Sequence, residues 1–211
     1  TTAFLLLSGT LLFYITEYNN TMKGMNVGER ILASLFSATT ARTAGFNSVD
    51  TGSLTSASKL LTCVLMFIGG SPGSTAGGIK TTTIFILVVS LWSGITDRHK
   101  TAVFKRRFED DAIKKASTVF TLNMFLAIFA LFTILAITDL SLSDVMFEVF
   151  SAIGTVGMTT GITRDLSSAA RIIIMVLMFC GRVGSLSFAL TFLQGKKDPP
   201  VYYPEEEISV G

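Results

Sequence analysis

The sequence FSATTARTAGFN at residues 36–47 matches FSAIGTVGMT at residues 150–159. In both stretches an apolar run leads into the pattern Thr-x-Gly, first at Thr43-Ala44-Gly45 and again at Thr155-Val156-Gly157. Glycine after a short apolar run is common at helix ends, so one copy alone carries little information. Two copies in the same context indicate a structural unit that occurs twice.

The correspondence continues downstream of the Thr-x-Gly pattern. Leu54-Thr55-Ser56-Ala57 matches Leu166-Ser167-Ser168-Ala169, and Val64-Leu65-Met66-Phe67 matches Val176-Leu177-Met178-Phe179. A match that keeps its register over so long a stretch is hard to attribute to composition. We therefore interpret the chain as two copies of one unit.

Each unit combines long and short apolar segments. A bilayer has a hydrocarbon core roughly 30 Å thick, so a spanning helix needs about 20 residues. The apolar runs before the loops, residues 31–38 and 145–153, are too short to cross. We expect them to be re-entrant helices, because irregular backbone is tolerated in a bilayer only where protein or a water-filled cavity surrounds it. A helix lying in the membrane interface is the alternative. The candidate spans are residues 3–15, 54–70, 116–138 and 169–193. The first of these is expected to be a span that is cut off at its start.

The overall composition supports a membrane protein. The chain has 211 residues, 49% of them hydrophobic and 15% charged, whereas soluble domains carry about 25% charged residues. A disordered or nucleic-acid-coating protein is excluded, and a net charge of +2 is too mild to indicate an acidic partner. Cys63 and Cys180 lie within apolar runs, which argues against a disulfide framework.

The charge distribution predicts how the chain is oriented. Residues 97–115 contain seven Lys or Arg and four Asp or Glu, so the positive-inside rule places this connector in the cytoplasm. The C-terminal tail should lie on the same side, and both loops should enter from outside. The expected organisation is all-α: a span, pore loop and span at 1–96, a cytoplasmic connector at 97–115, a second such unit at 116–195 and a cytoplasmic tail at 196–211.

The Thr-x-Gly loops suit an alkali-cation pathway. A dehydrated cation needs oxygen ligands in place of water, and backbone carbonyls provide them without fixed charge. Aligning successive carbonyls requires dihedral angles that glycine adopts most easily, which fits Gly45 and Gly157. We therefore expect a carbonyl-lined selectivity filter. Its candidate residues are Thr43, Ala44, Gly45 and Phe46 in the first loop and Thr155, Val156, Gly157 and Met158 in the second.

A Gly-rich segment, residues 69–78, interrupts the second span of the first unit. It holds five Gly and one Pro, so it cannot stay helical and should form a loop. Arg182 lies within the matching span of the second unit, where a charge costs about 2.5 kcal/mol or more. It is expected either to donate to carbonyls of the Gly-rich segment or to anchor to a carboxylate, for which Glu148 is the candidate. Replacing Arg182 by alanine separates the two, because only the first role predicts altered gating.

Other charges have weaker interpretations. Arg42 directly precedes the first loop and is expected either to brace it or to face an outer vestibule. The acidic residues Glu17, Glu29 and Asp50 could concentrate cations at the mouth of a pore, but Lys23 and Arg30 lie nearby. We therefore expect these acidic residues to lie in solvated loops.

These residues resemble the Trk/Ktr/HKT superfamily of potassium transporters, and within it most closely the ion-translocating membrane subunit of the bacterial Ktr system. The similarity covers essentially the whole chain. Its motifs are TAGFN at 43–47, GGSPGSTAGGIKT at 69–81 and GRVGS at 181–185. The resemblance implies the fold of potassium channels, with four such units around one pore, of which these look like the third and fourth.

The resemblance also implies a function. It predicts channel-like potassium uptake or symport across a bacterial cell membrane by a non-enzymatic, multi-pass protein, with K⁺ transported and Na⁺ a possible second ion. It predicts a homodimer of the full-length subunit and a cytosolic KtrA-like nucleotide-binding ring, so nucleotide would act only through that partner. The Gly-rich segment would be an intramembrane gate below the filter. The candidate gate residues are Gly69, Gly70, Ser71, Pro72, Gly73, Ser74, Thr75, Ala76, Gly77, Gly78 and Arg182.

One departure from potassium-channel filters affects the expected selectivity. Such filters commonly carry a second glycine after the aromatic residue, whereas Asn47 and Thr159 stand here. We therefore expect fewer ordered carbonyl sites and weaker discrimination of potassium from sodium.

Two alternatives from other classes remain at this point. Residues 73–81 approach the phosphate-binding pattern G-x-x-x-x-G-K-[ST], with Ile79 inserted before Lys80. The preceding segment is an apolar helix instead of a strand, and hydrolysis of ATP by the chain would be needed to support an ATPase. The second alternative is an alternating-access cation carrier with broken helices. Transport rates far above those of carriers would exclude it.

Overall fold

The computed structural model describes residues 1–74, 76–96, 102–103 and 106–184. Their regular secondary structure is helical, as expected, apart from a short antiparallel hairpin of β1 (Ala102–Val103) and β2 (Arg106–Arg107). The helices are α1 (Thr2–Glu17), α2 (Val27–Thr40), α3 (Ser56–Phe67), α4 (Thr81–Ile95), α5 (Asp110–Ile137), α6 (Leu142–Ile153) and α7 (Ser168–Val183), with a short 3-10 turn, η1 (Ile162–Arg164), before α7.

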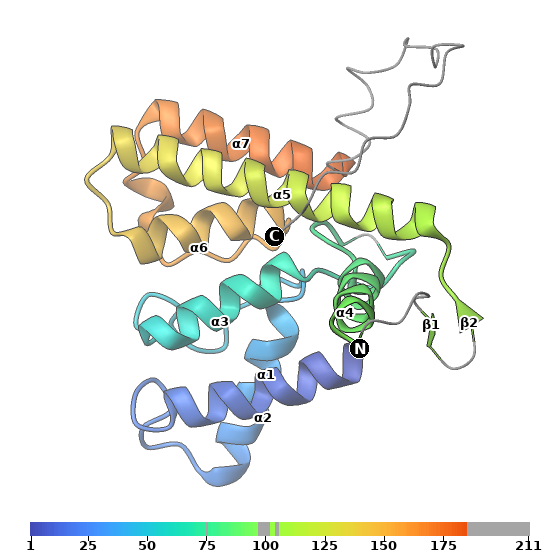
Figure 1. Ribbon diagram of the computed structural model, residues 1–211. Coiled ribbons are helices and arrows are strands. Elements are labelled where there is room, and N and C mark those ends of the chain that lie inside the picture. The colour runs from blue at the N-terminus through green and yellow to red at the C-terminus, as the bar shows by residue number, and fades with distance from the viewer. Residues whose placement is uncertain (75, 97–101, 104–105, 185–211) are drawn as a thin grey trace.

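The helices form two groups that meet along one seam. In the first group α1 packs against both α2 and α3, and in the second α5, α6 and α7 pack against one another. Helix α3 lies against α6 and joins the groups, whereas α4 turns away and packs across α5 (Figure 1). Each group thus contains three consecutive helices, α1 to α3 in the first and α5 to α7 in the second.

The matching helices of the two groups also begin in the same way. Thr55 precedes α3 and its side chain accepts a hydrogen bond from the backbone of Ser58, while Ser167 precedes α7 and accepts one from Ala170. A hydroxyl at this position satisfies a backbone donor of the first turn, which has no partner within the helix. The repeat seen in the sequence at Leu54 and Leu166 is thus a repeated helix start.

The observed helices differ in length from the spans predicted from the sequence. The expected span 54–70 is a helix only over Ser56–Phe67, and the chain becomes helical again at Thr81, after the Gly-rich segment that was expected to interrupt the span. The glycines and Pro72 between them stop the helix, so two short helices replace one long one. Among the described residues, only 111–137 forms a helix long and apolar enough to cross a bilayer. That helix begins within the expected connector 97–115, and the span expected at 169–193 is described only to residue 184.

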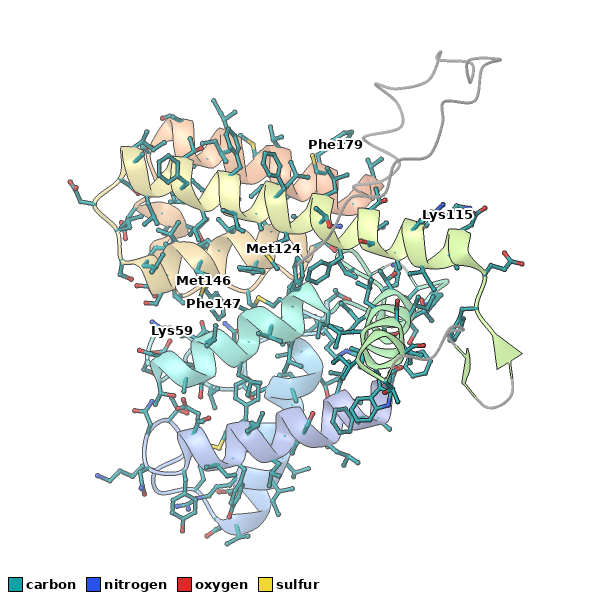
Figure 2. All side chains as sticks on the ribbon, viewed as in Figure 1. Lys59, Lys115, Met124, Met146, Phe147 and Phe179 are labelled. Atoms are coloured by element: carbon teal, nitrogen blue, oxygen red, sulfur yellow. The ribbon has the colours of Figure 1, made fainter. Side chains whose placement is uncertain are left out.

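Two apolar cores hold the groups together. One lies within the second group, between α5, α6 and α7, around the fully buried Ile134, Val145 and Val149. The other is shared between the groups, because Phe13 and Met66 of the first group pack with Phe147 of α6. Figure 2 shows Met146 and Phe147 projecting from α6 toward α3. Both cysteines are free and buried, as their apolar context predicts.

A buried carboxylate fastens the end of α1 to the start of α3. Glu17 is 0% exposed, although its neighbours in sequence suggested a solvated loop. One of its oxygens accepts from the backbone N–H and the hydroxyl of Thr55 at 2.9 and 2.8 Å, and the other accepts from Asn20 at 2.9 Å and from the Thr21 hydroxyl at 2.7 Å. Glu17 therefore has a structural role, and the expectation of a solvated acidic group is wrong.

We expect Glu17→Ala to destabilise the fold by roughly 2–4 kcal/mol, because it leaves buried donors without an acceptor. The measurement is the thermal unfolding of the purified protein in detergent. Glu29→Ala is the matched control, since Glu29 is exposed and its carboxylate accepts from the Asn26 N–H in the helix cap. The control should cost no more than about 1 kcal/mol. Equal effects of the two substitutions would contradict the role given to Glu17.

Candidate functional site

The two Thr-x-Gly loops share an unusual backbone. Thr43 has φ of +77° and Thr155 has φ of +54°, and these are the only non-glycine residues with positive φ in the part of the chain that the structure describes. Two residues later, Gly45 and Gly157 have φ of +78° and +87°. A left-handed residue turns its peptide plane relative to its neighbours, and this alternation is the kind of backbone that can direct successive carbonyls to one side. Strain at a threonine persists only where the surroundings enforce it, as at functional sites.

The helices before the loops hold this backbone in place. The N–H of Gly45 donates to the carbonyl of Thr40 at 3.2 Å, and the N–H of Val156 donates to that of Ser151 at 2.9 Å. In the first loop the Thr40 hydroxyl also bonds to both backbone groups of Phe46, accepting from N–H at 2.8 Å and donating to the carbonyl at 2.6 Å. Each loop is thus tied back to the last turn of its own short helix.

The two loops lie against each other across the seam between the groups. A Cβ atom placed on Gly45 would lie 2.2 Å from the carbonyl oxygen of Val156, so only glycine fits there. Beyond the loops, the Thr51 hydroxyl donates to the carbonyl of Thr159 at 2.5 Å. Val156 and Met158 are buried in the core shared by the groups, whereas Phe46 is 70% exposed. The equivalent positions of the two loops thus differ, because Met158 is buried and Phe46 is largely exposed.

The Gly-rich segment forms a loop that returns to its starting point. Its ends pair through the N–H of Ile79, which donates to the carbonyl of Phe67 at 3.1 Å, and the N–H of Thr81, which donates to that of Gly70 at 3.2 Å. Lys80 donates to the carbonyl of Ala76 across the loop. This network accounts for Lys80 without a phosphate ligand. Thr75, one of the candidate gate residues, lies outside the described residues.

Both ends of the Gly-rich segment are attached to the Thr-x-Gly loops. The Arg42 guanidinium donates to the carbonyl of Gly69 at 3.1 Å, and the N–H of Gly77 donates to the hydroxyl of Thr155 at 2.9 Å. A Cβ atom on Gly77 would lie between 2.3 and 2.9 Å from the Thr155 side chain. Arg42 therefore contacts the Gly-rich segment, a partner that neither of the roles expected for it included.

Arg182 lies beside the second loop. It lines a cavity of about 640 Å³ together with Glu148, Thr155, Gly157 and Arg164. The Glu148 carboxylate in this cavity accepts hydrogen bonds from the hydroxyls of Thr159 and Thr163. The cavity brings the candidate gate arginine and the second loop together.

Several of these structural features were not predicted from the sequence. The left-handed threonines were missed, although the repetition of Thr before Ala44-Gly45 and Val156-Gly157 was their only possible signal. The attachment of Arg42 to Gly69 joins residues 27 positions apart, and no spacing rule predicts it. Asp50 and Glu29 make local contacts, with the N–H of Gly52 at 3.2 Å and of Asn26 at 2.9 Å.

The surface shows which solvent surrounds the fold. On α1, Phe4, Leu7 and Ile15 are between 62% and 72% exposed, and on α5 Phe125 and Phe132 are 64% and 73% exposed. Aromatic and aliphatic side chains at this density are unfavourable in water. Together with two loops of irregular backbone held between helices, they define a helical membrane protein.

Comparison with known proteins identifies the family. The family model TrkH, described as a cation transport protein, matches residues 2–198. The chain belongs to this family of integral membrane cation transporters. It is 36% identical to the Ktr system potassium uptake protein B of Bacillus subtilis, over 98% of this chain and 48% of the relative. It is 38% identical to the potassium/sodium uptake protein NtpJ of Enterococcus hirae, over 100% of this chain and 48% of the relative.

A solved structure supports the same fold. The potassium transporter TrkH from Vibrio parahaemolyticus aligns with a TM-score of 0.72 and 19% sequence identity, covering 92% of this chain and 43% of that one. The chain thus spans about half the length of the curated relatives it matches.

Proposed function

We propose that this chain contributes two quarters of a potassium-conducting pore, with K⁺ as the transported substrate. The observation that carries the proposal is the left-handed geometry repeated at Thr43 and Gly45 and at Thr155 and Gly157, in two loops that touch. Backbone with this alternation offers several carbonyls to one ion. The names of the relatives, which describe potassium uptake and potassium/sodium uptake, agree with this substrate and with Na⁺ as a second ion.

In this proposal the filter consists of residues 43–46 and 155–158, and two further units complete the ring. Both loops enter from the outer face, so Thr43 and Thr155 lie at the inner end of the filter. Gly77 binds the hydroxyl of Thr155, which brings the Gly-rich segment to this inner end. The segment then acts as a gate, with Arg182 beside it in the cavity that Thr155 also lines.

The proposal extends to the membrane location and the partners of the protein. The protein is proposed to be the translocating subunit of a nucleotide-regulated Ktr-type system in a bacterial membrane, with the connector 97–115 in the cytoplasm. A homodimer and a cytosolic KtrA-like ring are the proposed partners. Supporting this, three relatives carry the name of the Ktr system, a term that implies further components.

An alternating-access carrier is the second candidate, because the helix formed by α3 and α4 is broken at mid-length. The two candidates differ in rate. We expect the full-length protein in liposomes to restore potassium flux at rates well above carrier turnover, and bi-ionic potentials to show a preference for potassium weaker than that of four-fold symmetric channels. Flux that saturates at carrier rates would favour the second candidate, and the absence of potassium flux would overturn both.

A further inference from the structure

The second Thr-x-Gly loop lacks the clamp that holds the first. In the first loop the Thr40 hydroxyl binds both backbone groups of Phe46. Counting back five residues from the loop glycine gives Thr40 in the first unit and Ala152 in the second, and alanine has no hydroxyl. The outer end of the second filter loop must therefore be positioned by other residues.

Glu148 lies where it can position the outer end of the second loop. It lies on α6, is only 5% exposed and lines the cavity beside the second loop. One carboxylate oxygen accepts from the hydroxyl of Thr159, which directly follows the filter residue Met158, and from the hydroxyl of Thr163 at 2.8 Å. The Thr159 hydroxyl also accepts from the N–H of Gly161 at 2.9 Å. A buried carboxylate with two hydroxyl donors is a strong hydrogen-bonding anchor.

Thr159 also accepts a hydrogen bond from the first unit. The Thr51 hydroxyl, on the segment that follows the first loop, donates to the carbonyl of Thr159 at 2.5 Å, and Thr51 is 4% exposed. Thr159 is thus fixed through its side chain by Glu148 and through its backbone by Thr51. Because Thr159 is adjacent to Met158, its position sets where the outermost carbonyl of the loop can point.

We propose that Glu148 is the positioning residue for the outer end of the second filter loop and thereby a determinant of potassium over sodium selectivity. This inference rests on the proposed filter. Glu148 acts by accepting hydrogen bonds that hold the loop in place. Without this anchor the outer carbonyl becomes more mobile and can move closer to the smaller ion, so sodium is admitted. Glutamine keeps an acceptor oxygen and loses only the charge, so the inference predicts that Glu148→Gln retains selectivity and Glu148→Leu does not.

The test measures bi-ionic potassium and sodium potentials of the full-length protein in liposomes. We expect Glu148→Leu to lower the permeability ratio about tenfold, the scale of a lost hydrogen bond to a charged group, and Thr163→Val and Thr51→Val to lower it by roughly threefold each. Two controls should leave the ratio unchanged. Glu29→Gln removes a carboxylate charge from an exposed helix start, and Thr133→Val removes a hydroxyl that bonds within α5.

The possible results distinguish a failure of the role given to Glu148 from a failure of the proposed potassium pore. Wild-type protein without potassium flux would overturn the proposed pore and this inference together. Wild-type flux with an unchanged ratio in Glu148→Leu and Thr163→Val would overturn the inference alone. A glutamine variant as unselective as the leucine variant would also overturn it, because the charge would then act directly. If Glu148→Leu does not reach the membrane, Thr163→Val and Thr51→Val decide the question by the same ratio.

Discussion

Substitution of Gly45 by alanine is expected to abolish potassium flux, lowering it by roughly a hundredfold or more. Two effects add at this position. The added Cβ would lie 2.2 Å from the carbonyl oxygen of Val156, and backbone cannot move aside as a flexible side chain can. The residue must also keep φ of +78°, which costs any residue with a side chain additional energy. The affected group is a carbonyl of the neighbouring loop, so both loops lose their alignment.

The second loop provides the matched control. Gly157 has φ of +87° and should suffer the same backbone strain, but within the described chain nothing lies within 4 Å of an added Cβ. We therefore expect Gly157→Ala to lower flux by about tenfold, less than Gly45→Ala. The measurement is potassium or rubidium flux in liposomes, normalised to inserted protein. If Gly45→Ala conducted as well as Gly157→Ala, contact between the loops would not matter for conduction.

Substitution of Gly77 by alanine is expected to raise basal flux by about tenfold in the absence of any regulatory partner. An added Cβ would collide with the Thr155 side chain at 2.3–2.9 Å, so the Gly-rich segment must withdraw from the inner end of the proposed filter. Withdrawal also breaks the hydrogen bond from the Gly77 N–H to the Thr155 hydroxyl. Both changes favour the open position of the segment.

Gly73 in the same segment distinguishes this steric effect from general strain. It has φ of +82° and nothing lies within 4 Å of its Cβ position among the described atoms, so Gly73→Ala adds strain without displacing Thr155. Its basal flux should stay within about twofold of wild type. A rise in both variants would point to loosening of the segment as a whole, and a fall in Gly77→Ala would contradict the gate.

The sequence alone predicted that the fold is helical and that the Gly-rich segment interrupts a helix, because these features depend on local patterns. Short apolar runs, hydroxyl residues before helices and glycine at loop positions act over a few residues, so they are visible without the fold. It could not predict that Arg42 reaches Gly69 or that Glu17 is enclosed by Thr55, because these contacts join distant segments. Glu17 shows the reason: its sequence neighbours are polar, and its burial depends on the packing of α1 against α3.

The predicted helix lengths were wrong for a different physical reason. Hydropathy identified residues 54–70 as one span, but the helix ends at Phe67, because glycines with low helix propensity follow it and Pro72 lacks a backbone donor. The chain then pairs Ile68 with Ile79 and continues as a second helix that packs across α5. Apolar content therefore predicted membrane location correctly and helix length incorrectly.

The apolar core shared by Phe13, Met66 and Phe147 has a consequence for biosynthesis. Phe147 is 0% exposed in this shared core, and α6 leaves the ribosome about 86 residues after α3 does, since the two helices begin at Leu142 and Ser56. Until then the first group presents an unfilled apolar surface where Phe147 will lie. The nascent chain must keep that surface covered by lipid or by the insertion machinery, so membrane insertion of the first group and completion of its fold are separate events in time.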